Sequence, residues 1–127
     1  MDVTSPNWKL THYPTPAGAR LVRLWIDECI DGRLRLLFPR HDCQTARFAN
    51  LAGLKNGPLL EAAEAGGFDV LITVDQNIPD QQNLAGRKIA LVILCGATNR
   101  LRDLAPLVPA ALSTLGSIEP GDVVRIG

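Results

Sequence analysis

Two short apolar segments of the chain each run directly into an acidic residue. Residues 24–26 lead into Asp27 and Glu28, and residues 71–74 lead into Asp75. In an open parallel sheet the carboxyl ends of the strands meet at one edge, and ligands bind there. If both segments are neighbouring strands, Asp27 and Asp75 share that edge. A pair of carboxylates at such a place suits a hard divalent cation and phosphate chemistry.

The cation that such a pair would select is Mg²⁺ or Mn²⁺. Both take oxygen ligands, and one or two carboxylates commonly hold them while water completes the shell. Beside a phosphodiester, the ion would polarise the phosphate and lower the pKa of a bound water. We therefore predict that Asp27 and Asp75 are metal ligands and catalytic residues.

Each acid also has a purely structural explanation. Asp27 and Glu28 could stabilise the first turn of a following helix, where acids favour the positive end of the dipole. Asp75 could close a turn together with Gln76 and Asn77. These explanations stay open at the level of the sequence.

Three further residues could contribute to a site around the two acids. Thr73 lies two positions before Asp75, so a strand directs both side chains to the same face. Its hydroxyl could bind a carboxylate or a ligand water, or it could be an ordinary β-branched strand residue. Asn56 and Asn77 offer neutral oxygens and would be weak metal ligands, although asparagine is also common in turns.

Basic residues follow the last strongly apolar segment. Arg100 and Arg102 could bind a phosphate. Thr98 or Asn99 could simply cap the helix that begins there. The sequence leaves both roles open.

Alternating apolar and polar segments must position these residues. We expect strands over 21–26, 42–46, 68–74, 88–94 and 122–126, a short helix or loop over 80–84, and helices over 30–38, 58–65 and 99–115. The last helix should break near Pro106 and Pro109. This alternation predicts an α/β domain over residues 21–127, with a mostly parallel sheet and helices on both faces. Residues 1–20 are predicted to be a poorly ordered N-terminal extension.

Composition excludes several classes of protein. The 13 basic and 13 acidic residues cancel, so no overall field would hold nucleic acid nonspecifically. The apolar stretches are too short to span a membrane, and the start of the chain lacks the pattern of a secretory signal. The 3 cysteines show no metal-binding spacing, which favours reduced thiols in the cytoplasm.

The quoted segments resemble those of small bacterial PIN-like proteins. Residues 26–28, followed by a short helix rich in Leu and Arg, resemble the start of that family. Residues 68–77 resemble its "TxDxD" segment. Residues 53–57 and 81–84 are similar to one subgroup, and the resemblance covers residues 21–126.

The resemblance implies a three-layer α/β/α fold and a Mg²⁺- or Mn²⁺-dependent ribonuclease, often the toxin of a toxin–antitoxin pair. It places the first family acid at Asp27 and the acid of the "TxD" segment at Asp75, and it matches Glu28 to the acid that follows the first. Two further family acids are replaced here, by Asn56 and Asn77, which should weaken a metal site. The expected partners are an RNA substrate, a cognate antitoxin and, in a homodimer, a second copy of the chain.

Two other functions remain open. A non-catalytic module could keep the fold and bind RNA or a partner protein, which the two asparagines and the zero net charge favour. A response-regulator-like domain also ends its strands in acids, but it needs a lysine at the end of a late strand. Residues 94–96, Leu-Cys-Gly, occupy that position, which argues against it.

Overall fold

The computed structural model describes residues 21–45, 56–81 and 83–127. Residues 1–20 and part of the subgroup motif at 53–57 lie outside these ranges, as do residues 46 and 82. The predictions for those positions therefore lie outside the described residues.

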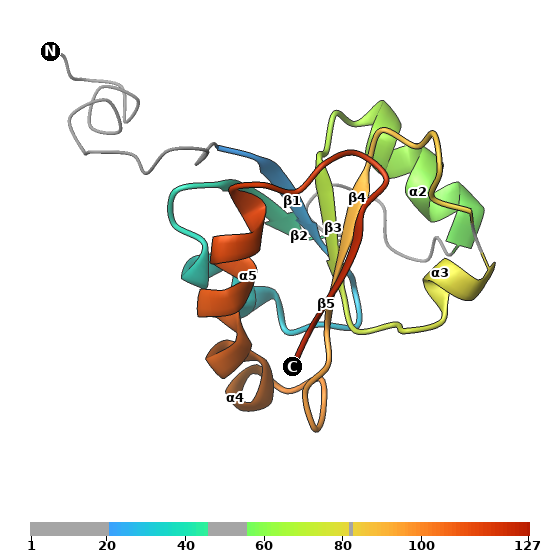
Figure 1. The fold of residues 1–127 in the computed structure, drawn as a ribbon. Coiled ribbons are helices and arrows are strands. Elements are labelled where there is room, and N and C mark those ends of the chain that lie inside the picture. The colour runs from blue at the N-terminus through green and yellow to red at the C-terminus, as the bar shows by residue number, and fades with distance from the viewer. Residues whose placement is uncertain (1–20, 46–55, 82) are drawn as a thin grey trace, which may run out of the picture.

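Five parallel strands form a single sheet in the order β2-β1-β3-β4-β5 (Figure 1). The strands are β1 (Arg23–Ile26), β2 (Asp42–Thr45), β3 (Val70–Thr73), β4 (Ala90–Leu94) and β5 (Val123–Ile126). This confirms the α/β class and the predicted strands, and every neighbouring pair is parallel. The central strands β3 and β4 are buried along their whole length, as expected for parallel strands covered on both faces.

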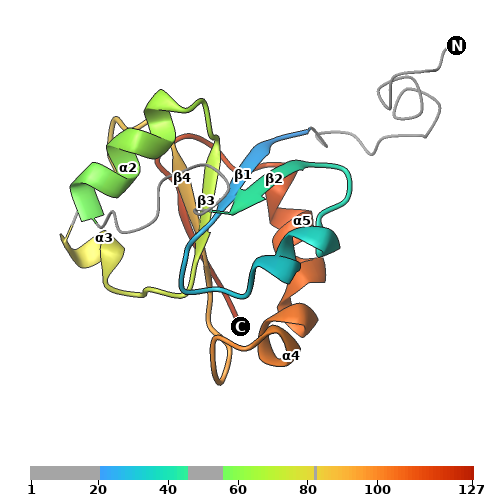
Figure 2. The ribbon, with the colours of Figure 1, turned by 180° about the vertical axis from the view of Figure 1, so that it is seen from behind.

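Helices cover both faces of this sheet (Figure 2). They are η1 (Gly32–Leu37), α2 (Asn56–Ala65), α3 (Ile78–Gln81), α4 (Leu101–Leu104), η2 (Ala105–Leu107) and α5 (Val108–Leu115). Buried residues of η1, α4 and α5 pack with one face, and residues of α2 and α3 pack with Trp25 and Leu71 on the other. The domain therefore has three layers and two apolar cores.

One of the expected helices differs in form, and another breaks as expected. The segment expected as a helix over 30–38 is a six-residue 3₁₀ helix, η1. Asp31 caps its first turn by accepting from Arg33 N–H, and Pro39 follows Phe38, so few residues remain for α-helical bonds. The segment 99–115 breaks into α4, η2 and α5 at the two prolines, as predicted.

The segment between β3 and β4 also differs. Its helix, α3, begins at Ile78 and not at Asp80. The chain turns immediately before it, because Asp75 Oδ1 accepts a hydrogen bond of 2.9 Å from Asn77 N–H. Ile78 is then buried in the core on the α2 side, which sets the start of the helix.

Candidate functional site

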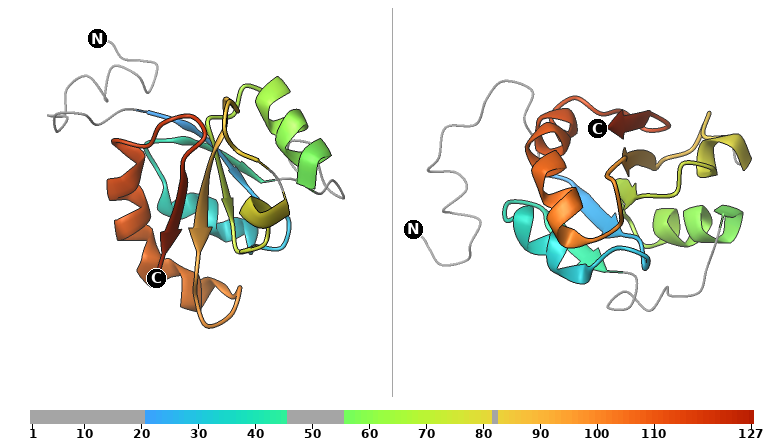
Figure 3. Two further views of the ribbon diagram at one scale, coloured as in Figure 1. Left: turned by 45° about the vertical axis from the view of Figure 1, so that its right-hand side comes forward. Right: turned by 90° about the horizontal axis from the view of Figure 1, so that it is seen from below.

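The strands β1 and β3 are neighbours and end at the same edge of the sheet. Ile26 lies opposite Ile72 in the register, and Asp27 N–H still donates to Ile72 C=O at 3.0 Å. The next strand in the sequence, β2, lies on one side of β1. The later strands β3, β4 and β5 lie in that order on its other side. The order therefore reverses between β1 and β3, where doubly wound sheets open a crevice for ligands. This edge faces the viewer in the right panel of Figure 3.

Thr73, the last residue of β3, connects the carboxylate of Asp27 to the backbone of Asp75. Its hydroxyl donates to Asp27 Oδ2 at 2.8 Å and accepts from Asp75 N–H at 3.0 Å. These two bonds keep Asp27 Oδ2 within about 6 Å of Asp75 N. Since an aspartate carboxylate lies within about 4 Å of its own nitrogen, the two carboxylates are at most about 10 Å apart.

The surroundings of Thr73 explain why it holds this position. Thr73 has 0% of its surface exposed, and among the described residues no other polar or charged residue is buried. A buried hydroxyl needs hydrogen-bond partners, and here it has one acceptor and one donor. The sequence had left open whether Thr73 binds a carboxylate, and in the structure it binds Asp27.

Asp27 receives further contacts from the loop that follows β1. Its Oδ1 accepts from Glu28 N–H at 2.8 Å, and the Cys29 Sγ lies 3.7 Å from Oδ2. Burial, and then the negative charge of Asp27, raises the pKa of the Cys29 thiol to about 11. At neutral pH this thiol is therefore protonated and donates toward Asp27.

Asp75 closes a turn with Asn77, which is one of its two predicted roles. Its carboxylate accepts a hydrogen bond from Asn77 N–H. Only Oδ1 is used in that bond, and a carboxylate oxygen has more than one acceptor position. The turn therefore leaves Asp75 able to bind a ligand. Both the structural and the ligand role are compatible with this geometry.

Two further predicted site residues contact the pair through their backbone N–H groups, Glu28 at Asp27 and Asn77 at Asp75. Glu28 and Asn77 are exposed next to Asp27 and Asp75, respectively. Asn56 is the first residue of α2. Within the described residues, no group of three or more His, Cys, Asp or Glu side chains is arranged to hold a metal ion. The possible ligands here are therefore two carboxylates beside a hydroxyl. Water would have to complete the coordination shell of one ion.

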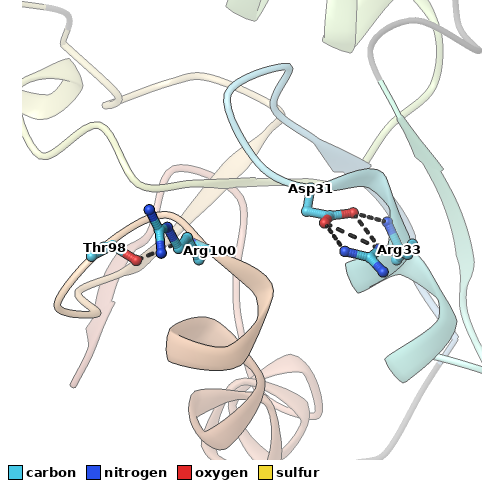
Figure 4. A network of polar contacts seen from close by, with 4 residues as sticks. All are labelled: Asp31, Arg33, Thr98 and Arg100. Atoms are coloured by element: carbon cyan, nitrogen blue, oxygen red, sulfur yellow. Dashed lines mark hydrogen bonds and ion pairs between the residues drawn. The ribbon is translucent and has the colours of Figure 1, made fainter.

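An open groove of about 510 Å³ lies next to Asp27, between the loop after β1 and the start of α4. Its lining residues are Cys29, Asp31, Arg33, Asn99, Arg100, Leu101 and Arg102. In Figure 4, Asp31 and Arg33 lie on one side of it and Thr98 and Arg100 on the other. Arg100 of the predicted site is thus placed across the groove from the loop after β1.

Hydrogen bonds organise both sides of the groove. Arg33 donates to both carboxylate oxygens of Asp31, with Nη2 at 2.6 Å from Oδ2, and these bonds lower the pKa of Asp31 to about 2. On the other side, Thr98 Oγ1 donates to Asp103 and accepts from Arg100 N–H. The two loops are therefore well defined before any ligand binds.

Asn99 joins the two sides and is a residue that sequence reasoning missed. Its Nδ2 donates to Cys29 C=O at 2.9 Å, which connects the loop after β4 to the loop after β1. The sequence suggested only a helix cap for Asn99. Its position directly after a strand was the available signal, but the partner loop was not visible in the sequence.

Comparisons with family models, with characterised proteins and with solved structures found no match to this chain. The finding that stands is the fold, a small α/β domain with a five-stranded parallel sheet. Among the described residues, no helix combines the length and the apolar character needed to cross a membrane.

Proposed function

We propose that the protein is a Mg²⁺- or Mn²⁺-dependent ribonuclease of the PIN-like type. The observation that supports this most directly is the link from Asp27 through Thr73 to Asp75 at the point where the strand order reverses. Two acids that follow neighbouring strands both lie at the edge where parallel sheets bind ligands. A packing role alone does not require that both follow buried strands at this edge.

The residues present fit one hard divalent cation. Asp27 and Asp75 would hold it together with water, because carboxylate oxygens are the donors that Mg²⁺ and Mn²⁺ prefer. Glu28, which the resemblance makes a further ligand, does not form a three-acid group with them in the described part of the chain. When bound, such an ion polarises a phosphodiester and lowers the pKa of a coordinated water. Thr73 holds Asp27 Oδ2 and the Asp75 backbone in place, and so it orients the Asp27 carboxylate.

This activity suits a toxin that cleaves cellular RNA and is held inactive by a cognate antitoxin. The resemblance to PIN-like proteins supports the toxin role, and the acids at the sheet edge support the chemistry. Induced expression with a growth readout tests the role separately from the chemistry. Growth arrest by the parent chain, relieved by Asp27→Asn, is the expected result.

The chemistry is tested by Asp27→Asn and Asp75→Asn, which keep the side-chain size and remove the charge. We expect each to lower RNA cleavage in Mn²⁺ by roughly 100-fold or more and to abolish Mn²⁺ binding measured by electron paramagnetic resonance. Glu119→Gln is the matched control, because Glu119 is exposed in the turn before β5, at the opposite end of the sheet. If all three variants cleave RNA like the parent, the proposal is wrong.

A second function, a non-catalytic binding module, is favoured by one observation. Asn77 is exposed beside Asp75 and supplies an amide where the resemblance leads us to expect a carboxylate. Fewer negative charges give a weaker metal site. Calorimetry that detects RNA or protein binding but no heat with millimolar Mn²⁺ would support the module over the nuclease.

A further inference from the structure

The groove beside Asp27 has a different charge from the chain as a whole. Its charged lining consists of Arg33, Arg100 and Arg102 against one acid, Asp31. The complete chain has a net charge of zero, so this excess of positive charge is local. A local excess is what an anionic ligand needs when no overall field attracts it.

Two of the three arginines are available to such a ligand. Arg33 is neutralised by Asp31 at 2.6 Å, whereas Arg100 and Arg102 are exposed. No carboxylate of the described residues forms an ion pair with either guanidinium. The neighbouring acid, Asp103, accepts a hydrogen bond from Thr98. The α4 side of the groove therefore offers two guanidinium groups for binding.

The groove lies beside the carboxylate pair, and Cys29 connects the groove to Asp27. Cys29 lines it, and the Sγ of Cys29 lies 3.7 Å from Asp27 Oδ2. The bond from Asn99 Nδ2 to Cys29 C=O holds the two walls together at this end. A chain-like ligand lying in the groove would therefore come close to Asp27 at the position of Cys29.

We propose that this groove binds the phosphodiester backbone of single-stranded RNA on one side of the bond to be cleaved. The inference rests on the ribonuclease function proposed above and adds the path of the substrate. Guanidinium groups bind phosphate oxygens in pairs of hydrogen bonds, and they offset the repulsion between phosphates and the carboxylates of Asp27 and Asp75. Leu101 and the flat guanidinium groups offer surfaces on which unstacked bases can rest.

The test measures binding apart from cleavage. A fluorescein-labelled single-stranded RNA is titrated in EDTA with the parent, Arg100→Gln, Arg102→Gln and the control Lys88→Gln, over a range of salt concentrations. Lys88 is exposed and precedes β4, so its variant removes the same charge at the opposite edge of the sheet. We expect each arginine variant to raise Kd about fivefold and to lower the salt slope by about 0.7, and Lys88→Gln to change neither.

The outcomes separate the two proposals. Arginine-dependent binding without cleavage in Mn²⁺ supports the groove and contradicts the ribonuclease. Cleavage by the parent with unchanged binding by both arginine variants overturns the groove and leaves the ribonuclease. Polyaspartate can also be added as a competitor at the same total charge as unlabelled RNA. If it displaces the labelled RNA equally well, the proposed RNA groove is overturned, and an acidic peptide is the better ligand. Equal urea midpoints for the variants exclude unfolding as the cause.

Discussion

Thr73 is the residue on which the geometry of the candidate site depends. Its hydroxyl is fully buried, donates to Asp27 Oδ2 and accepts from Asp75 N–H. Valine has nearly the same shape but can neither donate nor accept. The contribution of one hydroxyl to stability and to ligand binding can therefore be measured with little change in packing.

We predict that Thr73→Val lowers the free energy of unfolding by about 1–3 kcal/mol, because it leaves the partly buried Asp75 N–H without its acceptor. Mn²⁺ affinity should fall as well, since Asp27 loses the bond that orients it. Urea denaturation and Mn²⁺ titration measure the two effects. Thr73→Ser keeps the hydroxyl and should retain most of the metal affinity. Equal Mn²⁺ affinity in Thr73→Val and the parent would show that the bond to Asp27 does not matter for binding.

At the scale of the elements, α2 is connected to the start of β4 by a partly buried carboxylate. Glu64, near the end of α2, accepts from Arg87 Nη1 at 2.8 Å and from Lys88 N–H at 2.6 Å. Burial raises the pKa of Glu64, but the hydrogen bonds from Lys88 and Arg87 outweigh it and leave the pKa below its usual value. The charged form is therefore the stabilising one.

We predict that Glu64→Gln lowers the free energy of unfolding by about 1–2 kcal/mol at pH 7. The effect should decrease as the pH falls below about 4.5, because Glu64 of the parent is then protonated too. Urea denaturation at several pH values measures it. Glu61→Gln, an exposed position on the same helix, should change stability by less than about 0.5 kcal/mol. Similar effects of the two substitutions would contradict a special role for Glu64.

At the scale of the whole molecule, one histidine connects the beginnings of β1 and β2. His41 Nδ1 accepts from Val22 N–H at 3.1 Å. Burial lowers the pKa of His41, so the neutral ring is favoured in the folded state. A proton on Nδ1 would also displace the hydrogen bond from Val22.

Since the unfolded chain binds the proton more readily, stability should fall as the pH drops below about 6.5, the value for an unperturbed histidine. We predict a lower urea midpoint at pH 5.5 than at pH 7.5 for the parent. In His41→Asn, the amide oxygen can still accept from Val22 but cannot titrate. The difference between the urea midpoints at pH 5.5 and pH 7.5 should therefore be smaller than in the parent. If the variant and the parent lose the same stability over this range, His41 is not its cause.

The sequence determined those features that depend on short stretches of chain. Buried strands read as continuous apolar segments, and Pro106 and Pro109 remove hydrogen-bond donors, so the strands and the break before α5 could be predicted. The acids after β1 and β3 could be identified as candidates for the same reason. The form of η1 was not predicted, although the cap at Asp31 and the proline at position 39 leave only six residues, few for α-helical hydrogen bonds.

Only the tertiary structure decided which loops meet. Apolar periodicity identifies a strand but not its neighbour, because the order of strands depends on how all the layers pack together. The pairing of β1 with β3 brings Thr73 to Asp27, and the position of β4 beside β3 brings Asn99 to Cys29. Side chains more than 40 positions apart in the sequence are therefore hydrogen-bonded at one edge of the sheet, and the groove between Arg33 and Arg100 follows from the same arrangement.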